Sequence, residues 1–215
     1  MYSIIKFNLL YYINNIEEAI YIASYFIIIN FIFAFSLNDK VHASHEVHSA
    51  GLFIGLFVCL SLSSIHVYQR DADSGVLEVW QQMAVSNYRI ILSKLASAFA
   101  ASLCPILVTL PLILVIVGEP FSTLPHLCLA MTAAGFSMAI IAQLAATLAI
   151  GVGRGRAILL LLVFPFLMPV FIFGNEYAAH IDHLWHPSLL FLLAYSIFML
   201  PILCLAGSSA IRMSN

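Results

Sequence analysis

Residues 96–117 read ASAFAASLCPILVTLPLILVIV and contain no charged side chain. As a helix this stretch is about 33 Å long, at about 1.5 Å per residue, which matches the apolar thickness of a lipid bilayer. Lipid offers no hydrogen-bond partners to a free backbone, so a crossing segment of one chain has to be helical. The stretch therefore predicts a membrane-spanning helix, bent at Pro105 and Pro111.

The composition of the whole chain agrees with this interpretation. Hydrophobic residues make up 63% of the 215 residues, charged residues only 8%, and the mean hydropathy is +1.04. Soluble domains carry about 25% charged residues. The net charge is −2 and the chain has no basic patch, so we do not expect it to bind a nucleic acid. We expect it to lie in the lipid bilayer.

Six apolar runs are long enough to cross a bilayer. They predict an all-α integral membrane protein with six transmembrane helices in a single domain over residues 1–215. The predicted spans lie near residues 19–37, 50–68, 96–117, 125–149, 157–174 and 188–207. The preceding segment 1–18 is apolar but interrupted by polar residues, and it predicts an interfacial helix on the membrane surface.

Basic residues predict the orientation of these spans. Seven of the eight lysines and arginines fall in the segments that would share one side with the termini: Lys6, Arg70, Arg89, Lys94, Arg154, Arg156 and Arg212. The other side has only Lys40. Because cytoplasmic loops are enriched in basic residues, both termini are expected in the cytoplasm.

The longest segment between spans, residues 69–95, predicts a short cytoplasmic helix from Val76 to Ala84. Its apolar residues gather on one face, which suits either docking into a groove of a soluble partner or lying on the membrane. The chain has no G-x-x-x-x-G-K-[ST] motif and therefore no recognisable nucleotide site of its own. Any driven transport would then take its energy from another subunit, or from an ion gradient.

Two histidine triplets share a spacing of three, HASHEVH at 42–48 and HIDHLWH at 180–186. Imidazole is a common ligand of zinc and of haem iron. Both triplets fall in loops on the predicted outer side, where they would contact haem or a metal, or simply face solvent. The candidates are His42, His45, His48, His180, His183 and His186.

Three polar residues lie deep inside the apolar runs: Asn30, Gln143 and Thr147. Polar groups at this depth are costly unless they have partners. They predict either a path for a polar substrate or hydrogen bonds between neighbouring helices.

Two stretches together resemble one known family. RDADSGVLEVW, with the lysine of SKLAS that leads into the third span, is similar to the cytoplasmic loop of the CcmB family, the membrane subunit of the cytochrome c maturation ABC transporter. GVGRGRAILLLLVFPFLMPVFIFG, with its pair Pro165 and Pro169, is similar to the fifth span of that family. The likeness extends over nearly the whole chain.

This resemblance implies an ABC-2 type permease in the bacterial inner membrane, without an ATPase site of its own. It implies a CcmA-like ATPase subunit that binds ATP and Mg²⁺, CcmC-like and CcmD-like membrane subunits, and a CcmE-like haem chaperone. ATP hydrolysis would drive haem delivery, or release of the haem-loaded chaperone, on the periplasmic side. The ATPase-coupling candidates are Asp71, Asp73, Gly75, Leu77, Glu78, Trp80 and Lys94.

Other functions remain open from the residues. The same helices suit an ABC-2 type permease that exports a lipid, a polysaccharide or a drug. They also suit a non-transporting assembly factor. The histidines leave a third alternative, an intramembrane histidine metalloenzyme.

Overall fold

The computed structural model of the chain describes residues 16–37, 45–73, 86–151, 156–180 and 186–213. Within these ranges the secondary structure is helical, and six helices are long. They are α2 (Ile16–Leu37), α3 (His45–Asp73), α5 (Asn87–Val117), α6 (Leu124–Gly151), α7 (Arg156–Ala179) and α8 (Pro187–Met213), with a short 3₁₀ turn, η1 (Phe121–Thr123).

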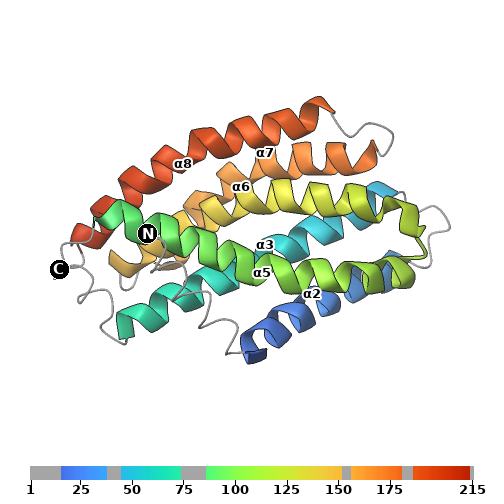
Figure 1. Cartoon of the computed structure of the whole chain (residues 1–215), viewed down its shortest axis with the longest axis horizontal. Helices are drawn as coiled ribbons and strands as arrows, with labels where there is room; N and C mark the ends of the chain where they lie inside the picture. The colour runs from blue at the N-terminus through green and yellow to red at the C-terminus, as the bar shows by residue number, and fades with distance from the viewer. Residues whose placement is uncertain (1–15, 38–44, 74–85, 152–155, 181–185, 214–215) are drawn as a thin grey trace.

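The six helices run alternately up and down in one elongated bundle (Figure 1). The end of α8 lies at the same end as the end of α3 and the start of α5, while α2 starts near the middle of the bundle and runs away from this end. The opposite end holds the end of α7 and the starts of α6 and α8.

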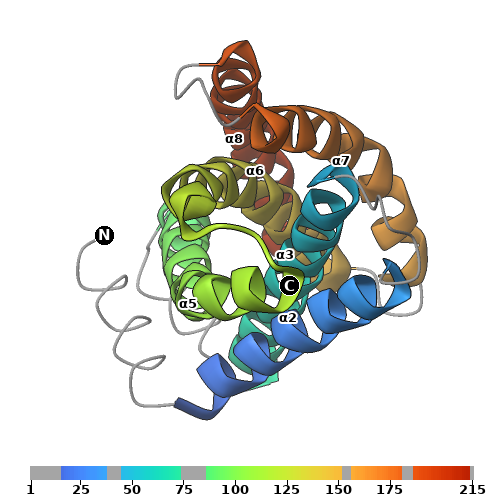
Figure 2. The same ribbon diagram turned by 90° about the vertical axis from the view of Figure 1, so that its right-hand side faces the viewer.

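Helix α6 forms the centre of the bundle. It packs against α3, α5, α7 and α8, while α2 and α8 lie at opposite margins (Figure 2). In the most apolar part of α6, 78% of the residues are buried, compared with 11% in α2. Small residues such as Ala130, Ala134 and Ala139 let its neighbours approach closely.

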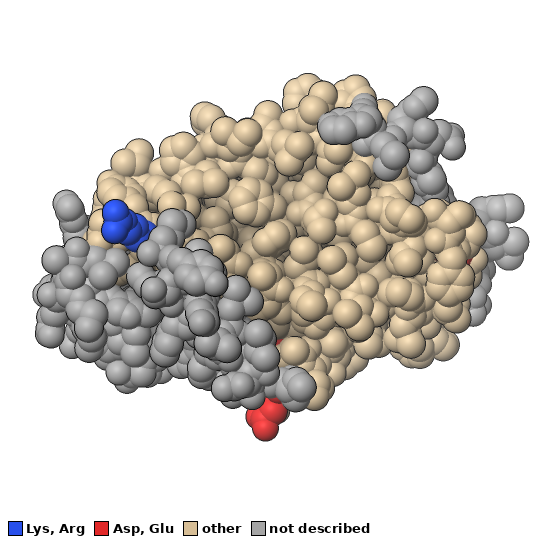
Figure 3. All heavy atoms as spheres, viewed as in Figure 1, with Lys and Arg blue, Asp and Glu red and all other residues tan. Residues whose placement is uncertain are grey.

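The surface of the bundle is apolar along its length. Among the residues that the structure describes, Figure 3 shows charged side chains only toward the margins of the face in view, and large apolar residues such as Val108, Phe198 and Ile197 are exposed. Four helices are long and apolar enough to cross a membrane, namely α2, α5, α6 with its 3₁₀ turn, and α8; a shorter apolar stretch, His48–Ser64, lies in α3. The chain is an all-helical membrane protein.

Close packing between α2 and α3 depends on glycine. A Cβ atom on Gly55 would lie 3.0 Å from the amide nitrogen of Asn30 and 3.1 Å from the ring of Phe26. Both of these residues are buried. Because few real Cβ atoms approach a neighbour so closely, the two helices need a residue without a side chain at this contact.

The ends of α5 follow from local sequence. Ser86 has an extended backbone and precedes the first helical residue, Asn87. At the other end Gly118 adopts a left-handed conformation with φ 80°, and its N–H donates to the carbonyl of Leu114 at 2.9 Å. Only glycine takes this conformation at low cost, so it ends the helix at Val117.

A helix covers each of the six predicted spans, four of these helices are long and apolar enough to cross a membrane, and the helices extend beyond the predicted bounds. The third helix begins at Asn87 instead of near residue 96, and α3 continues to Asp73, five residues beyond the predicted end of its span near residue 68. The helices are longer because polar residues can continue a helix once it has left the apolar layer. The suggested 76–84 helix lies within 74–85, outside the described residues, as does most of the segment 1–18.

Some of the buried polar side chains form hydrogen bonds with backbone carbonyls of their own helix. Asn30 donates its amide N–H to the carbonyl of Phe26 at 2.8 Å, and the Thr147 hydroxyl donates to the carbonyls of Gln143 and Leu144. For these two residues, the contacts found are therefore within a helix and not between helices. Hydrogen bonds between helices do occur elsewhere, as between the hydroxyls of Ser137 in α6 and Ser196 in α8, 2.6 Å apart.

Candidate functional site

The predicted coupling segment joins α3 to α5. Asp71 and Asp73 belong to the last turn of α3, and α5 begins at Asn87. Gly75, Leu77, Glu78 and Trp80 fall outside the described residues, so their role as an ATPase contact stays a prediction. Residues 74–85 connect the end of α3 to Ser86 and the start of α5.

Lys94 lies in a different environment from the exposed loop assumed for it. It is in the second turn of α5 and its side chain is fully buried, with 0% exposure. Ser93 and Leu95 beside it are buried as well. A surface contact with a soluble partner would need the side chain to leave the bundle, so any contribution of Lys94 to coupling comes from inside.

Three helices meet close to this lysine. A Cβ atom on Gly207 of α8 would lie 3.0 Å from Ile91 of α5 and 3.4 Å from the hydroxyl of Thr147 in α6. Ile91 is one turn before Lys94 on α5. A displacement of the start of α5 is therefore passed to α6 and α8 through tight packing, because packed cores deform little.

A second polar cluster lies at the opposite end of the bundle. Of the six histidines in the two triplets, the structure brings together His180, directly after α7, and His186, directly before α8. Their rings stack with centroids 4.4 Å apart and planes 18° apart. His48 is half-buried in α3, and the side chains of His42, His45 and His183 are not among those described.

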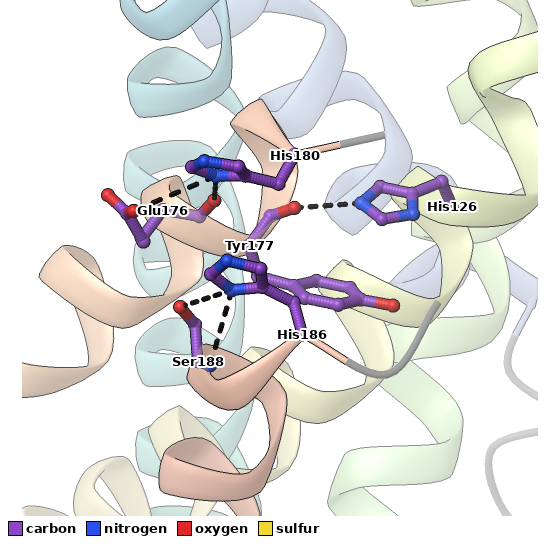
Figure 4. Close-up of polar contacts among 6 residues, drawn as sticks. All are labelled: His126, Glu176, Tyr177, His180, His186 and Ser188. Atoms are coloured by element: carbon purple, nitrogen blue, oxygen red, sulfur yellow. Dashed lines mark hydrogen bonds and ion pairs between the residues drawn. The ribbon is translucent and has the colours of Figure 1, made fainter. Parts of the chain in front are cut away.

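The third member of this cluster is Glu176, in the last turn of α7 (Figure 4). One ligand atom from each of Glu176, His180 and His186 lies within 4.8 Å of the other two. His180 Nδ1 is 2.8 Å from the carbonyl oxygen of Glu176 and 3.7 Å from its carboxylate. Sequence analysis missed Glu176, although its i,i+4 spacing to His180 on a helix was a usable signal.

His126 at the start of α6 fixes the end of α7 beside this cluster. Its Nε2 donates to the carbonyl of Tyr177 at 2.7 Å, because a carbonyl oxygen can only accept. The two rings also stack, with centroids 4.5 Å apart. Both residues are buried, so the contact is shielded from solvent.

The cluster is chemically suited to holding a cation. Glu176 and His180 are exposed and His186 is half-buried, so their donor atoms are accessible at the end of the bundle. The C-terminus of a helix carries a partial negative charge, which the carboxylate of Glu176 increases.

Comparison with known proteins identifies the family. The family model described as "CcmB protein" matches residues 1–214. "Heme exporter protein B" of Pseudomonas aeruginosa is 21% identical over 151 residues, covering 70% of this chain and 68% of its own length. "Heme exporter protein B" of Rhodobacter capsulatus is 21% identical over 153 residues, covering 71% and 70%. The match along the chain, on an all-helical membrane bundle, shows that this protein belongs to the CcmB family.

Proposed function

We propose that this chain is the membrane permease subunit of an ABC complex for cytochrome c maturation. In this function a partner hydrolyses ATP, and the bundle couples that hydrolysis to haem delivery or to release of a haem-loaded chaperone outside the membrane. The observation that carries the proposal is the family match over residues 1–214. The relatives named "Heme exporter protein B" support haem as the transported group.

The architecture supports a passive membrane subunit that is moved by a partner. The sequence has no Walker A motif, so the nucleotide and its Mg²⁺ belong to another chain. The excess of basic residues on the side of the termini supports a cytoplasmic position for residues 74–85, where an ATPase would reach them. The protein would then lie in the bacterial inner membrane.

The movement of the ATPase would be transmitted through contacts between packed helices. A CcmA-like ATPase would contact Leu77 and Glu78 together with the apolar face that includes Trp80. Its movement would reach α5 at Asn87 and then α6 and α8 at the contact of Ile91 with Gly207. CcmC-like and CcmD-like membrane subunits and a CcmE-like chaperone would complete the complex, with lipid-exposed helices such as α2 free to receive membrane partners.

The coupling contact can be tested by co-purification of the ATPase subunit with the tagged chain. Glu78→Lys and Trp80→Glu should each reduce the amount of ATPase recovered and the amount of mature cytochrome c. Glu17→Lys is a matched control, because Glu17 is an exposed carboxylate in the first turn of α2 and lies outside the proposed coupling segment. The control should retain both partner and product.

The proposal of a coupling helix is wrong if all three variants bring down the same amount of ATPase and support the same cytochrome level. Loss of the ATPase without any change in c-type cytochromes would instead favour export of another substrate, such as a lipid, a polysaccharide or a drug. In each case the amount of the variant in the membrane fraction has to match that of the wild type.

A further inference from the structure

Two imidazoles and one carboxylate meet where α7 ends and α8 begins. Glu176 is in the last turn of α7, His180 follows that helix, and His186 precedes α8. Their ligand atoms lie within 4.8 Å of one another. We propose that these three residues bind a divalent first-row transition-metal ion, with Zn²⁺ as the reference ion.

The hydrogen bonds of His180 leave the appropriate atom free for an ion. The carbonyl oxygen of Glu176 can only accept, so the contact at 2.8 Å requires a proton on His180 Nδ1. In the neutral ring, Nε2 then carries the lone pair. This pairing of one ring N–H with a backbone carbonyl is the usual support of a metal-binding histidine.

His186 has an equivalent support on the other helix. Its Nδ1 lies 2.9 Å from the hydroxyl oxygen of Ser188, which is buried in the first turn of α8. The hydroxyl oxygen can accept a hydrogen bond from a protonated Nδ1, which leaves the lone pair of Nε2 for the ion. The backbone N–H of Ser188 also donates to Nδ1, but at 3.4 Å, so this longer and weaker contact is readily given up.

The distances between the three ligand atoms suit one ion after small rotations of the side chains. Zinc bonds of about 2.0–2.1 Å to nitrogen in a tetrahedral site place two donors about 3.3–3.4 Å apart. The two rings are nearly parallel and 4.4 Å apart, so rotations about side-chain bonds bring their edges to this distance. Exposure of Glu176 and His180 leaves a fourth position for water or for a partner.

Charge also favours a cation here. The end of α7 and the Glu176 carboxylate are both negative, and a carboxylate at a helix C-terminus is unfavourable without a positive partner. A set of two nitrogens and one oxygen suits Zn²⁺, Co²⁺ or Ni²⁺, whereas Mg²⁺ and Ca²⁺ prefer oxygen ligands alone. Free haem would use an imidazole but would not need Glu176. The carboxylate therefore discriminates between an ion and haem.

The experiment measures Zn²⁺ and Co²⁺ binding to the purified full-length protein in detergent or nanodiscs. Calorimetry and a competing chelator give the Zn²⁺ affinity, and the visible absorption of Co²⁺ reports nitrogen and oxygen ligands. Loss of an outer-shell partner typically weakens metal binding about 10–100-fold, so removing a ligand by His180→Ala, His186→Ala or Glu176→Gln should weaken it at least that much. Glu176→His should restore binding.

Two controls accompany these variants. His48→Ala removes another histidine of the triplets and Glu119→Gln removes another partly exposed carboxylate, and neither should change the affinity. Size-exclusion profiles and melting curves identify variants that have failed to fold, and the restoring Glu176→His variant provides an independent check.

Equal Zn²⁺ affinity and equal Co²⁺ spectra in the wild type and in all ligand variants would overturn the proposal. Binding of haem that depends on His180 or His186 but is unaffected by Glu176→Gln, without any Zn²⁺ binding, would overturn it in favour of a haem contact. None of these readouts involves ATP or cytochromes. The experiment can therefore disprove the metal site without affecting the proposed transporter function, and the cytochrome tests can disprove the transporter function without affecting the metal site.

Discussion

His126 of α6 donates a hydrogen bond to the main-chain carbonyl of Tyr177 in α7 at 2.7 Å, and the two rings stack with centroids 4.5 Å apart. Tyr177 lies directly after Glu176 and three residues before His180. The contact therefore fixes the end of α7, where the proposed metal ligands are, against the central helix of the bundle.

His126→Ala should loosen this end of α7. Loss of the hydrogen bond leaves a buried carbonyl with fewer partners, which typically costs about 1–3 kcal/mol. We expect a lower melting temperature in detergent and faster protease cleavage between α7 and α8. Zn²⁺ affinity should fall by less than on removing His180 itself. His126→Gln, which keeps a donor, should recover part of the loss; identical melting and cleavage in His126→Ala and wild type would show that the contact does not hold the helix.

A pair of glycine variants tests the packing of α2 against α3. Alanine at Gly55 would place its Cβ 3.0 Å from Asn30, whereas alanine at Gly135 in α6 would meet its neighbours at an ordinary 3.5 Å. Gly55→Ala should therefore destabilise the bundle, since overpacking typically costs about 1–3 kcal/mol. Gly135→Ala should be neutral or slightly stabilising, because alanine favours a helix by about 1 kcal/mol over glycine.

Thermal unfolding of both glycine variants, in the same detergent, provides the comparison. The same melting temperature for Gly55→Ala and Gly135→Ala would mean that α2 can shift away from α3 without cost.

The predicted orientation can be mapped with single cysteines. Ser86, just before α5, and Ser122, in the turn before α6, are both exposed and lie at opposite ends of α5. In a variant without the four native cysteines, Ser122→Cys should react with a membrane-impermeant maleimide added to intact cells, and Ser86→Cys only after the membrane is opened. The reverse pattern would place residues 74–85 outside the cell and remove the basis for an ATPase contact.

Much of the fold was predictable because a lipid bilayer permits few backbone conformations. Apolar runs such as 96–117 have to become helices, and the basic residues predict their orientation. The ends were not predictable in the same way. α3 reaches Asp73 and α5 begins at Asn87, because beyond the apolar layer a helix can continue with polar residues that hydropathy cannot distinguish from a turn.

The candidate sites depend on contacts between distant segments, which the sequence shows only in part. The sequence shows the histidines as two triplets with a spacing of three. The structure instead joins His180 with His186 across two helices and adds Glu176 through i,i+4 spacing on α7. Lys94 was read as a loop residue that leads into a span, whereas α5 begins seven residues earlier, at Asn87, and buries it.

The most direct test of the proposed function is the level of c-type cytochromes after deletion of the gene for this chain. Haem staining of membrane proteins and absorption spectra measure covalently attached haem, with b-type cytochromes as the internal control. The account predicts that every c-type cytochrome is lost while b-type cytochromes remain, and that the wild-type gene restores the loss but Glu78→Lys does not. Normal c-type cytochromes in the deletion strain would contradict it.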